Sequence, residues 1–174
     1  MGVSAVVAVI VSPILRNDAE VLLIERSNHP LDPWAGHMAL PGGKINKGDS
    51  SLAYTALRET KEELGIQLTP SQQSKIEIPI ATAGIHIGKP VYVQPIIFEC
   101  MKPSKFLIDE TEIADFTWVP LKAFQESSKH KHYELVNAQP LKPGVEISFN
   151  GKKKIVWGMT YNILVNLSAE ISKS

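Results

Sequence analysis

Three glutamates follow a glycine-rich loop at a spacing that can serve chemistry. Glu59, Glu62 and Glu63 stand three and four positions apart, so on a helix their carboxylates lie on one face. Like charges at this spacing repel and cost an isolated helix roughly a few tenths of a kcal/mol per pair. A hard divalent cation such as Mg²⁺ or Mn²⁺ prefers oxygen ligands of this kind and would offset the repulsion. The spacing therefore indicates a metal site, with an ordinary solvated helix face as the alternative interpretation.

The loop before this helix, and an arginine on the helix, could complete such a site. Gly42 and Gly43 can adopt backbone conformations closed to other residues, so a main-chain carbonyl or amide can approach a metal ion or a phosphate closely. Arg58 comes one turn before Glu62 and could brace the carboxylates without binding metal itself. An ordinary turn is the alternative interpretation of the glycines.

The helix that must carry these residues is predicted to begin at residue 50 or 51 and to end at Leu64. Small and apolar residues recur along it at steps of three and four. Asp49 or Ser50 can cap its start, and Gly65 stands where a helix end favours a left-handed residue. The preceding residues 27–50 are dense in Pro and Gly, which predicts a surface loop.

The rest of the chain predicts a sheet with helices on it. Apolar runs favour strands over residues 3–11, 20–25, 76–81 and 91–99, and a short helix is expected near residues 121–127. Asn150-Gly151 between two alternating runs predicts a two-residue hairpin, and an amphipathic helix over residues 159–171 closes the chain. This mixed order predicts an α+β fold, an α/β/α sandwich with a mixed β-sheet covered by helices. We expect one domain over residues 1–174.

The composition limits the partners of this domain. Lys plus Arg and Asp plus Glu number 18 each, so no net field favours nucleic acid or an anionic membrane. The apolar run at the start is too short to span a bilayer and lacks a basic leader. Cys100 has no partner for an internal disulfide, which favours a reducing cytoplasm. The oligomeric state stays open; the first strand and last helix would serve a homodimer interface or a core equally well.

The glycine loop and acidic helix together resemble the Nudix box, written G-x5-E-x7-R-E-U-x-E-E-x-G-U with U an apolar residue. Reading from Gly43, five residues lead to Asp49 at the first acidic position. The stretch "RETKEELGI" then matches from Arg58 to Ile66, except for Thr60 at an apolar position. Asp49 replaces a glutamate, and eight residues instead of seven separate it from Arg58. The mutual spacing of the three helix glutamates is intact.

These departures themselves resemble the coenzyme A diphosphatase type of Nudix enzyme. "LLIERS" before the loop, "WVPL" at residues 118–121 and "VWGMTYNIL" at residues 156–164 are similar to later and earlier motifs of that subgroup. Between Ser27 and Gly36 the subgroup normally carries an Arg, whereas this chain has "NHPLDPWA". The likeness covers most of the chain.

The resemblance implies a metal-dependent hydrolase that cleaves the diphosphate of a nucleoside diphosphate linked to another group. Coenzyme A or a derivative is the favoured substrate. Glu59, Glu62 and Glu63 are implied to hold Mg²⁺ or Mn²⁺, with the carbonyl of Gly43 as a further ligand, and Arg58 belongs to the catalytic set. One carboxylate must stay free to take a proton from water.

The resemblance also implies a general base outside the box, on a loop some tens of residues later. Glu110 and Glu112 are the candidates in "IDETEIADFTWVPL". Glu112 is preferred because it stands just before the apolar step into "WVPL". A solvated acidic loop is the alternative interpretation.

Four further residues are candidates for contacting the substrate. Arg26 and Lys44 could meet phosphate oxygens, Trp34 could stack on a base, and the backbone of Gly42 could approach the substrate. Each also has a plain structural explanation, and His37 in the same loop is more simply a surface or packing residue.

The expected partner is a small-molecule nucleoside diphosphate derivative, and three other functions stay open. The same fold could act on ADP-ribose, a dinucleotide or a nucleoside triphosphate. A non-catalytic nucleotide-sensing module belongs to another class of protein, and an isomerase acting on an isoprenoid diphosphate has no further support in the chain.

Overall fold

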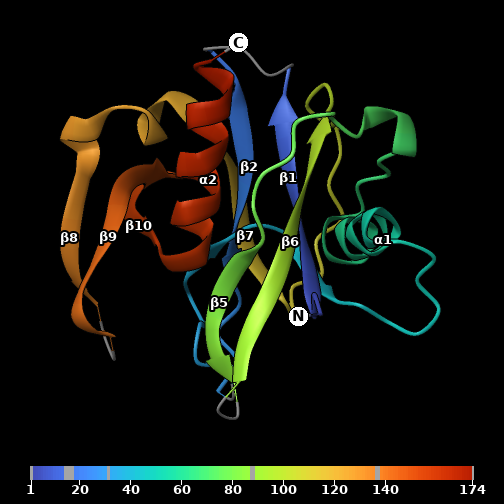
Figure 1. Ribbon diagram of the computed structural model, residues 1–174, viewed down its shortest axis with the longest axis horizontal. Coiled ribbons are helices and arrows are strands. Elements are labelled where there is room, and N and C mark those ends of the chain that lie inside the picture. Colours follow the sequence, from blue (N-terminus) through green and yellow to red (C-terminus); the bar gives the residue numbers. More distant parts are fainter. Residues whose placement is uncertain (1, 14–17, 31, 87–88, 136–137, 174) are drawn as a thin grey trace.

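The computed structural model describes residues 2–13, 18–30, 32–86, 89–135 and 138–173. Its centre is a mixed sheet of seven strands within this part of the chain (Figure 1). β1 (Ala5–Ser12) pairs parallel with β6 (Lys89–Glu99) and antiparallel with β2 (Glu20–Arg26) and β4 (Gly42–Lys44). β3 (Met38–Ala39) and β7 (Ile113–Pro120) pair with β2, and β5 (Ala81–His86) pairs with β6.

A smaller antiparallel sheet follows in the chain. It holds β8 (His130–Leu135), β9 (Ala138–Phe149) and β10 (Lys152–Trp157). β9 and β10 turn at Asn150-Gly151, where both residues have positive φ, 48° and 78°, as the Asn-Gly signal predicts. Lys154 of β10 reaches Glu25 of β2 at 2.6 Å, so an ion pair joins the two sheets.

Two helices cover the two faces of the central sheet. Alternate residues of β1 point to opposite sides, because side chains on a strand alternate. Val6, Ala8 and Ile10 join the core under α1 (Leu52–Leu64), whereas Val9 and Val11 join the core under α2 (Gly158–Ile171). The α/β/α sandwich predicted from the sequence is therefore confirmed. No helix in the described ranges has the length and apolar character needed to cross a membrane.

The predicted helix before Gly65 is confirmed, but its first cap is not. Ser51, rather than Asp49 or Ser50, is the N-cap, and its Oγ accepts the backbone N–H of Tyr54 at 3.0 Å. Gly65 ends the helix in the left-handed conformation, with φ 66°. Asp49 instead accepts two hydrogen bonds from Arg58.

Several other predicted elements need correction. The loop over residues 27–50 contains β3 and β4, which pair with distant strands that local sequence does not reveal. The strand expected at residues 76–81 begins only at Ala81, because Pro79 has no N–H to donate to a ladder. The helix near residues 121–127 is two 3₁₀ turns, Leu121–Phe124 and Ser127–Lys129.

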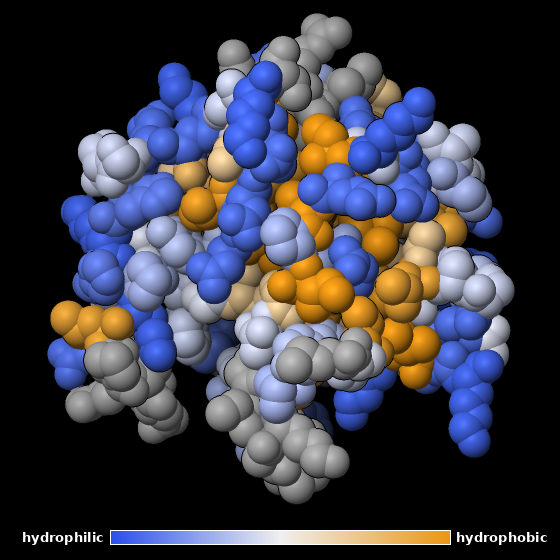
Figure 2. Space-filling view, in the orientation of Figure 1, coloured by the Kyte–Doolittle hydropathy of each residue, from blue (hydrophilic) through white to orange (hydrophobic). Residues whose placement is uncertain are grey.

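One face of the molecule carries an apolar area beside the sheet. The segment before β5 crosses in front of β1 in Figure 1, and Figure 2 shows apolar side chains near the middle of this face, with charged ones around them. Ile76, Ile78 and Ile80 of this segment line a hollow with Pro95 and Ile97 of β6. The acidic residues of α1 do not line it.

Candidate active site

The glycine loop lies directly against the acidic face of α1. Glu63 is buried, with 4% of its surface exposed, and its Oε2 accepts the backbone N–H of Gly42 at 3.0 Å. Burial raises the pKa of Glu63 to about 8, and the charges of Glu112 and Glu59 add to the rise. The Gly42 N–H and the charge of Arg26 act in the opposite direction. A buried carboxylate with two acidic neighbours marks a place built for positive charge.

Gly43 lies equally close to a second carboxylate. A Cβ added to Gly43 would stand 2.5 Å from the carboxylate carbon of Glu59, closer than such atoms approach. The side chain of Glu59 is 14% exposed, and burial raises its pKa, with the charges of Glu62 and Glu112 acting in the same direction. Only glycine at position 43 lets this carboxylate sit against the backbone of β4.

Arg58 joins the loop and the helix. Its Nη1 lies 2.8 Å from Glu59 Oε1 and 2.9 Å from Glu62 Oε2, and its Nη2 donates to the carbonyl of Lys44 at 3.1 Å. The hydrogen bonds to carboxylates, that to Asp49 foremost, raise the pKa of Arg58 above its ordinary value. Arg58 thus braces the carboxylates, as its position one turn before Glu62 predicts.

Asp49 is the partner that the sequence analysis did not assign. Its two oxygens accept from Arg58 Nε and Nη2, both at 3.0 Å, and Oδ2 also accepts from the Thr55 hydroxyl and the Asn46 N–H. The hydrogen bonds from Arg58 hold the pKa of Asp49 well below its usual range. Its place at the first acidic position of the Nudix pattern was the available signal.

Glu112 lies on a loop that meets the same carboxylates. Its charge raises the pKa of both Glu59 and Glu63, so it faces them from outside α1. The Glu112 side chain is exposed to solvent, and its carbonyl accepts the Ser27 N–H at 2.9 Å. Glu110, the other candidate base, lines a pocket beside this loop.

The candidates for substrate contact differ in their exposure and in their partners. Arg26 acts electrostatically on Glu63, although its Nε is paired with Asp32 at 2.7 Å. Lys44 is exposed and contributes its carbonyl to Arg58. Trp34 is 45% exposed on the loop after β2, and the neighbouring His37 packs edge-on against Trp157 at 5.2 Å.

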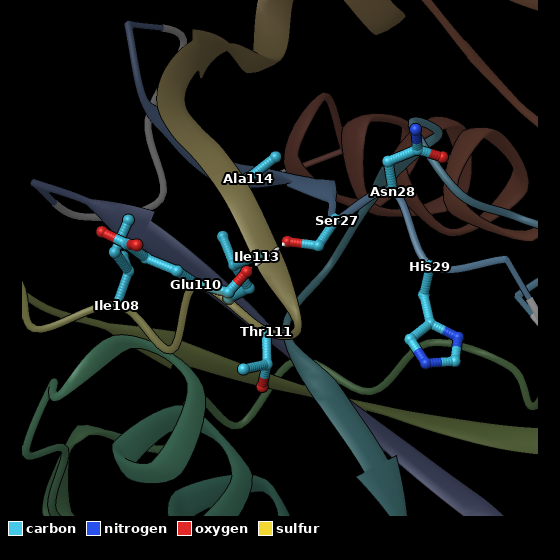
Figure 3. A pocket seen from close by; sticks show the side chains of 8 residues that line it. All are labelled: Ser27, Asn28, His29, Ile108, Glu110, Thr111, Ile113 and Ala114. Atoms are coloured by element: carbon cyan, nitrogen blue, oxygen red, sulfur yellow. Dashed lines mark hydrogen bonds between the residues drawn. The ribbon is translucent and has the colours of Figure 1, made fainter.

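A pocket of about 470 Å³ opens next to Glu112. Figure 3 shows its lining: one side comes from the residues after β2 and the other from the loop into β7. Among the residues that the structure describes, the lining side chains mix hydrogen-bonding and apolar groups and include neither Lys nor Arg: Ser27, Asn28, His29, Ile108, Glu110, Thr111, Ile113 and Ala114. This is a volume typical of small-molecule sites.

The donor set suits a hard divalent cation. All candidate ligands are oxygens, and Glu59, Glu63 and Glu112 repel one another at close quarters. Within the described residues, no three acidic, His or Cys side chains yet surround one point, since Arg58 holds Glu59 and Glu62. The predicted convergence of the three helix carboxylates on one point is therefore not found in the described residues, because Glu59 and Glu62 bond Arg58 and Glu63 bonds the Gly42 N–H.

Comparison with known proteins defines the class of this enzyme. The family model for the NUDIX domain matches residues 5–139. The chain belongs to the Nudix family of hydrolases, enzymes that act on pyrophosphate bonds and typically use a divalent metal ion.

Three individual proteins are similar to this chain, with different identities and coverages. NudL of Yersinia pestis, an uncharacterized Nudix hydrolase, is 28% identical over 165 residues, covering 95% of this chain and 79% of NudL. An Ap4A hydrolase of C. elegans, in a binary complex, is 26% identical with a TM-score of 0.51, covering 70% of this chain and 82% of that one. A MutT/nudix family protein of Enterococcus faecalis has a TM-score of 0.67 at 18% identity, covers 100% of this chain and 64% of its own, and supports the fold.

Proposed function

We propose that this Nudix hydrolase cleaves the diphosphate of a nucleoside diphosphate linked to another group, with coenzyme A or a derivative as the favoured substrate. The observation that carries the proposal is the group of mutually repelling carboxylates of Glu59, Glu63 and Glu112, of which Glu59 and Glu63 lie against the Gly42-Gly43 backbone. Folding such a group without a cation costs free energy. A cost of this kind is typical of catalytic sites.

Glu59, Glu62 and Glu63, with the Gly43 carbonyl, would hold Mg²⁺ or Mn²⁺. When bound, the metal supplies positive charge to the diphosphate oxygens. Arg58 keeps Glu59 and Glu62 in place through its bonds to Asp49 and to the Lys44 carbonyl. These ties would let the carboxylates keep their arrangement while the substrate enters.

Glu112 is the proposed general base. Its carboxylate is exposed yet lies near Glu59 and Glu63, so it can take a proton from a water that attacks phosphorus beside them. Arg26 is proposed to pair with a phosphate oxygen, because its charge reaches Glu63. Lys44 and the Gly42 backbone are proposed to contact the diphosphate, and Trp34 to stack on the base.

The preference for coenzyme A rests on the resemblance described above and on the pocket beside Glu112. A pocket lined without Lys or Arg suits a neutral arm that carries amides and hydroxyls, such as the pantetheine part, better than another phosphate. ADP-ribose and dinucleotides are the alternatives of the same fold, and the similar C. elegans protein is by name an Ap4A hydrolase.

The test is a substrate panel with Mg²⁺ and Mn²⁺, read out by product identity. Release of 3',5'-ADP and phosphopantetheine from coenzyme A would support the favoured substrate, whereas AMP and ribose 5-phosphate from ADP-ribose would replace it. Glu62→Gln and Glu63→Gln should abolish metal-dependent product release. Glu77→Gln is the matched control, because Glu77 is exposed and lies outside α1. Unchanged turnover in the helix variants would refute the assigned site.

A further inference from the structure

We infer that Ser27 is a positioning residue: its hydroxyl holds the turn at residues 109–112 so that Glu112 stays beside the helix carboxylates. The inference rests on the proposed function, since it concerns the residue proposed there as general base. Ser27 also lines the pocket proposed for the pantetheine arm, but its two bonds to the turn go to backbone carbonyls, so it acts on Glu112 through the backbone.

One side of this turn is tied to α1. The Leu107 N–H donates to the carbonyl of Leu64, and the Asp109 N–H donates to the carbonyl of Glu63, both at 2.9 Å. The bond from Asp109 therefore ties the start of the turn to Glu63, whose carboxylate is buried against Gly42. This tie sets where the turn begins but leaves its far end to other contacts.

The turn is closed internally by Asp109. Its Oδ1 accepts the Thr111 N–H at 2.9 Å and the Thr111 hydroxyl at 2.6 Å. Its carbonyl accepts the N–H groups of Glu112 and Ile113 at 3.0 and 2.9 Å. These bonds shape the turn, but they do not fix its orientation relative to the sheet.

Ser27 holds the far end of the turn, next to the Arg26–Ile113 pair of the β2–β7 ladder. Its N–H donates to the Glu112 carbonyl at 2.9 Å, and its hydroxyl donates to the Glu110 carbonyl at 2.8 Å. Figure 3 shows the Ser27 hydroxyl directed toward Glu110. The β2–β7 ladder shifts register between Glu25 and Arg26, so regular pairing ends just before this point. The two bonds from Ser27 extend the contact between β2 and the chain before β7 by one residue. They hold the turn through the carbonyls on either side of Thr111.

The hydroxyl bond is the part of this anchor that mutation can remove alone. Ser27→Ala deletes the bond to Glu110 and keeps the N–H bond to Glu112, while Ser27→Thr keeps both. Because Glu112 is exposed, few side-chain contacts hold it, and its position depends on the backbone that Ser27 grips. A shift of about 1 Å in a catalytic group can cost up to a hundredfold in rate.

The experiment is a double-mutant cycle between Ser27 and Glu112 with steady-state kinetics. Ser27→Ala should lower kcat roughly tenfold with KM within about twofold, Ser27→Thr should restore most of it, and Ser27→Ala should cost nothing further in a Glu112→Gln background. Ser74→Ala is the matched control, since Ser74 is also half-buried, its hydroxyl accepts the N–H of the nearby Ile76 at 3.3 Å, and it lies outside the turn. It should leave kcat unchanged.

A second readout needs neither metal nor turnover. Amide hydrogen exchange in residues 109–113 of the metal-free protein should quicken in Ser27→Ala and not in Ser27→Thr or Ser74→Ala. Unchanged exchange, or losses in the cycle that simply add, would overturn the inference while leaving the proposed function intact. Loss of the proposed function would show differently, as a wild-type protein that hydrolyses no diphosphate in the panel.

Discussion

Asp49 and Arg58 form a two-bond ion pair, with Oδ1 3.0 Å from Nε and Oδ2 3.0 Å from Nη2. The Asp49 side chain is 3% exposed and that of Arg58 18%, so the pair is largely shielded from water. It joins the loop before α1 to the middle of that helix. Glu59 and Glu62 are therefore held by an arginine that is itself held from outside the helix.

Replacing Asp49 should weaken the contacts by which Arg58 holds Glu59 and Glu62. Asp49→Asn keeps the bonds from Thr55 and Asn46 in part but leaves Arg58 without its charged partner, so we expect a lower Tm and a kcat reduced roughly tenfold or more. Asp18→Asn, which neutralises an exposed aspartate, is the control and should change neither. Thermal unfolding and kinetics on the same samples check this. An active, equally stable Asp49→Asn would show that Arg58 needs no such support.

A methyl group at Gly43 should displace a carboxylate without unfolding the protein. The added Cβ would fall 2.5–2.6 Å from the Glu59 carboxylate, which is the end of a flexible side chain and can move away. We expect Gly43→Ala to lower kcat by roughly ten- to a hundredfold, because displacing a catalytic group by about 1 Å has effects of this size. Gly48→Ala is the control, since a Cβ there meets nothing within 4 Å. Equal activity of the two variants would contradict the proposed place of Glu59 in the site.

Neutralising Glu63 should stabilise the metal-free protein at alkaline pH. The pKa of Glu63 is raised from 4.5 to about 8, so the folded state binds its proton more tightly than the unfolded state. Stability from this group is present below pH 4.5 and is lost as the pH rises toward 8. Glu63→Gln removes that loss and should gain roughly 1–3 kcal/mol at pH 8 and little at pH 5.

Urea unfolding in the presence of a chelator, at both pH values, measures this gain. Glu62→Gln is the control, because the Glu62 side chain is 58% exposed and should gain much less. A Glu63→Gln protein no more stable than wild type at pH 8 would mean that burial does not strain this carboxylate.

The parts of the fold that the sequence predicted are those set by local chemistry. The α1 helix follows from its periodicity and Gly65, and the β9–β10 turn follows from Asn150-Gly151. β3 and β4 could not be predicted, because they are two and three residues long and exist only by pairing with β2 and β1. Local signals specify turns and helix ends, whereas short strands depend on distant partners.

The same division holds within the candidate site. The spacing of Glu59, Glu62 and Glu63 alone predicts that they share one helix face. The tie between Asp49 and Arg58 and the grip of Ser27 on the Glu112 loop depend on chain paths that bring separate segments together. A sequence pattern can therefore place candidate groups on one helix face, but the contacts that support them come from tertiary structure.

Trp34 offers a test of substrate contact that is separate from the metal site. It is 45% exposed on the loop after β2, so removing it should cost little stability. If its ring stacks on the base, Trp34→Ala should raise KM roughly five- to twentyfold with kcat nearly unchanged, which corresponds to about 1–2 kcal/mol of stacking. Tyr54→Ala is the matched control, because Tyr54 is an aromatic residue of similar exposure, 47%, on α1. A KM that does not change in Trp34→Ala, or that changes equally in both variants, would remove Trp34 from the substrate site.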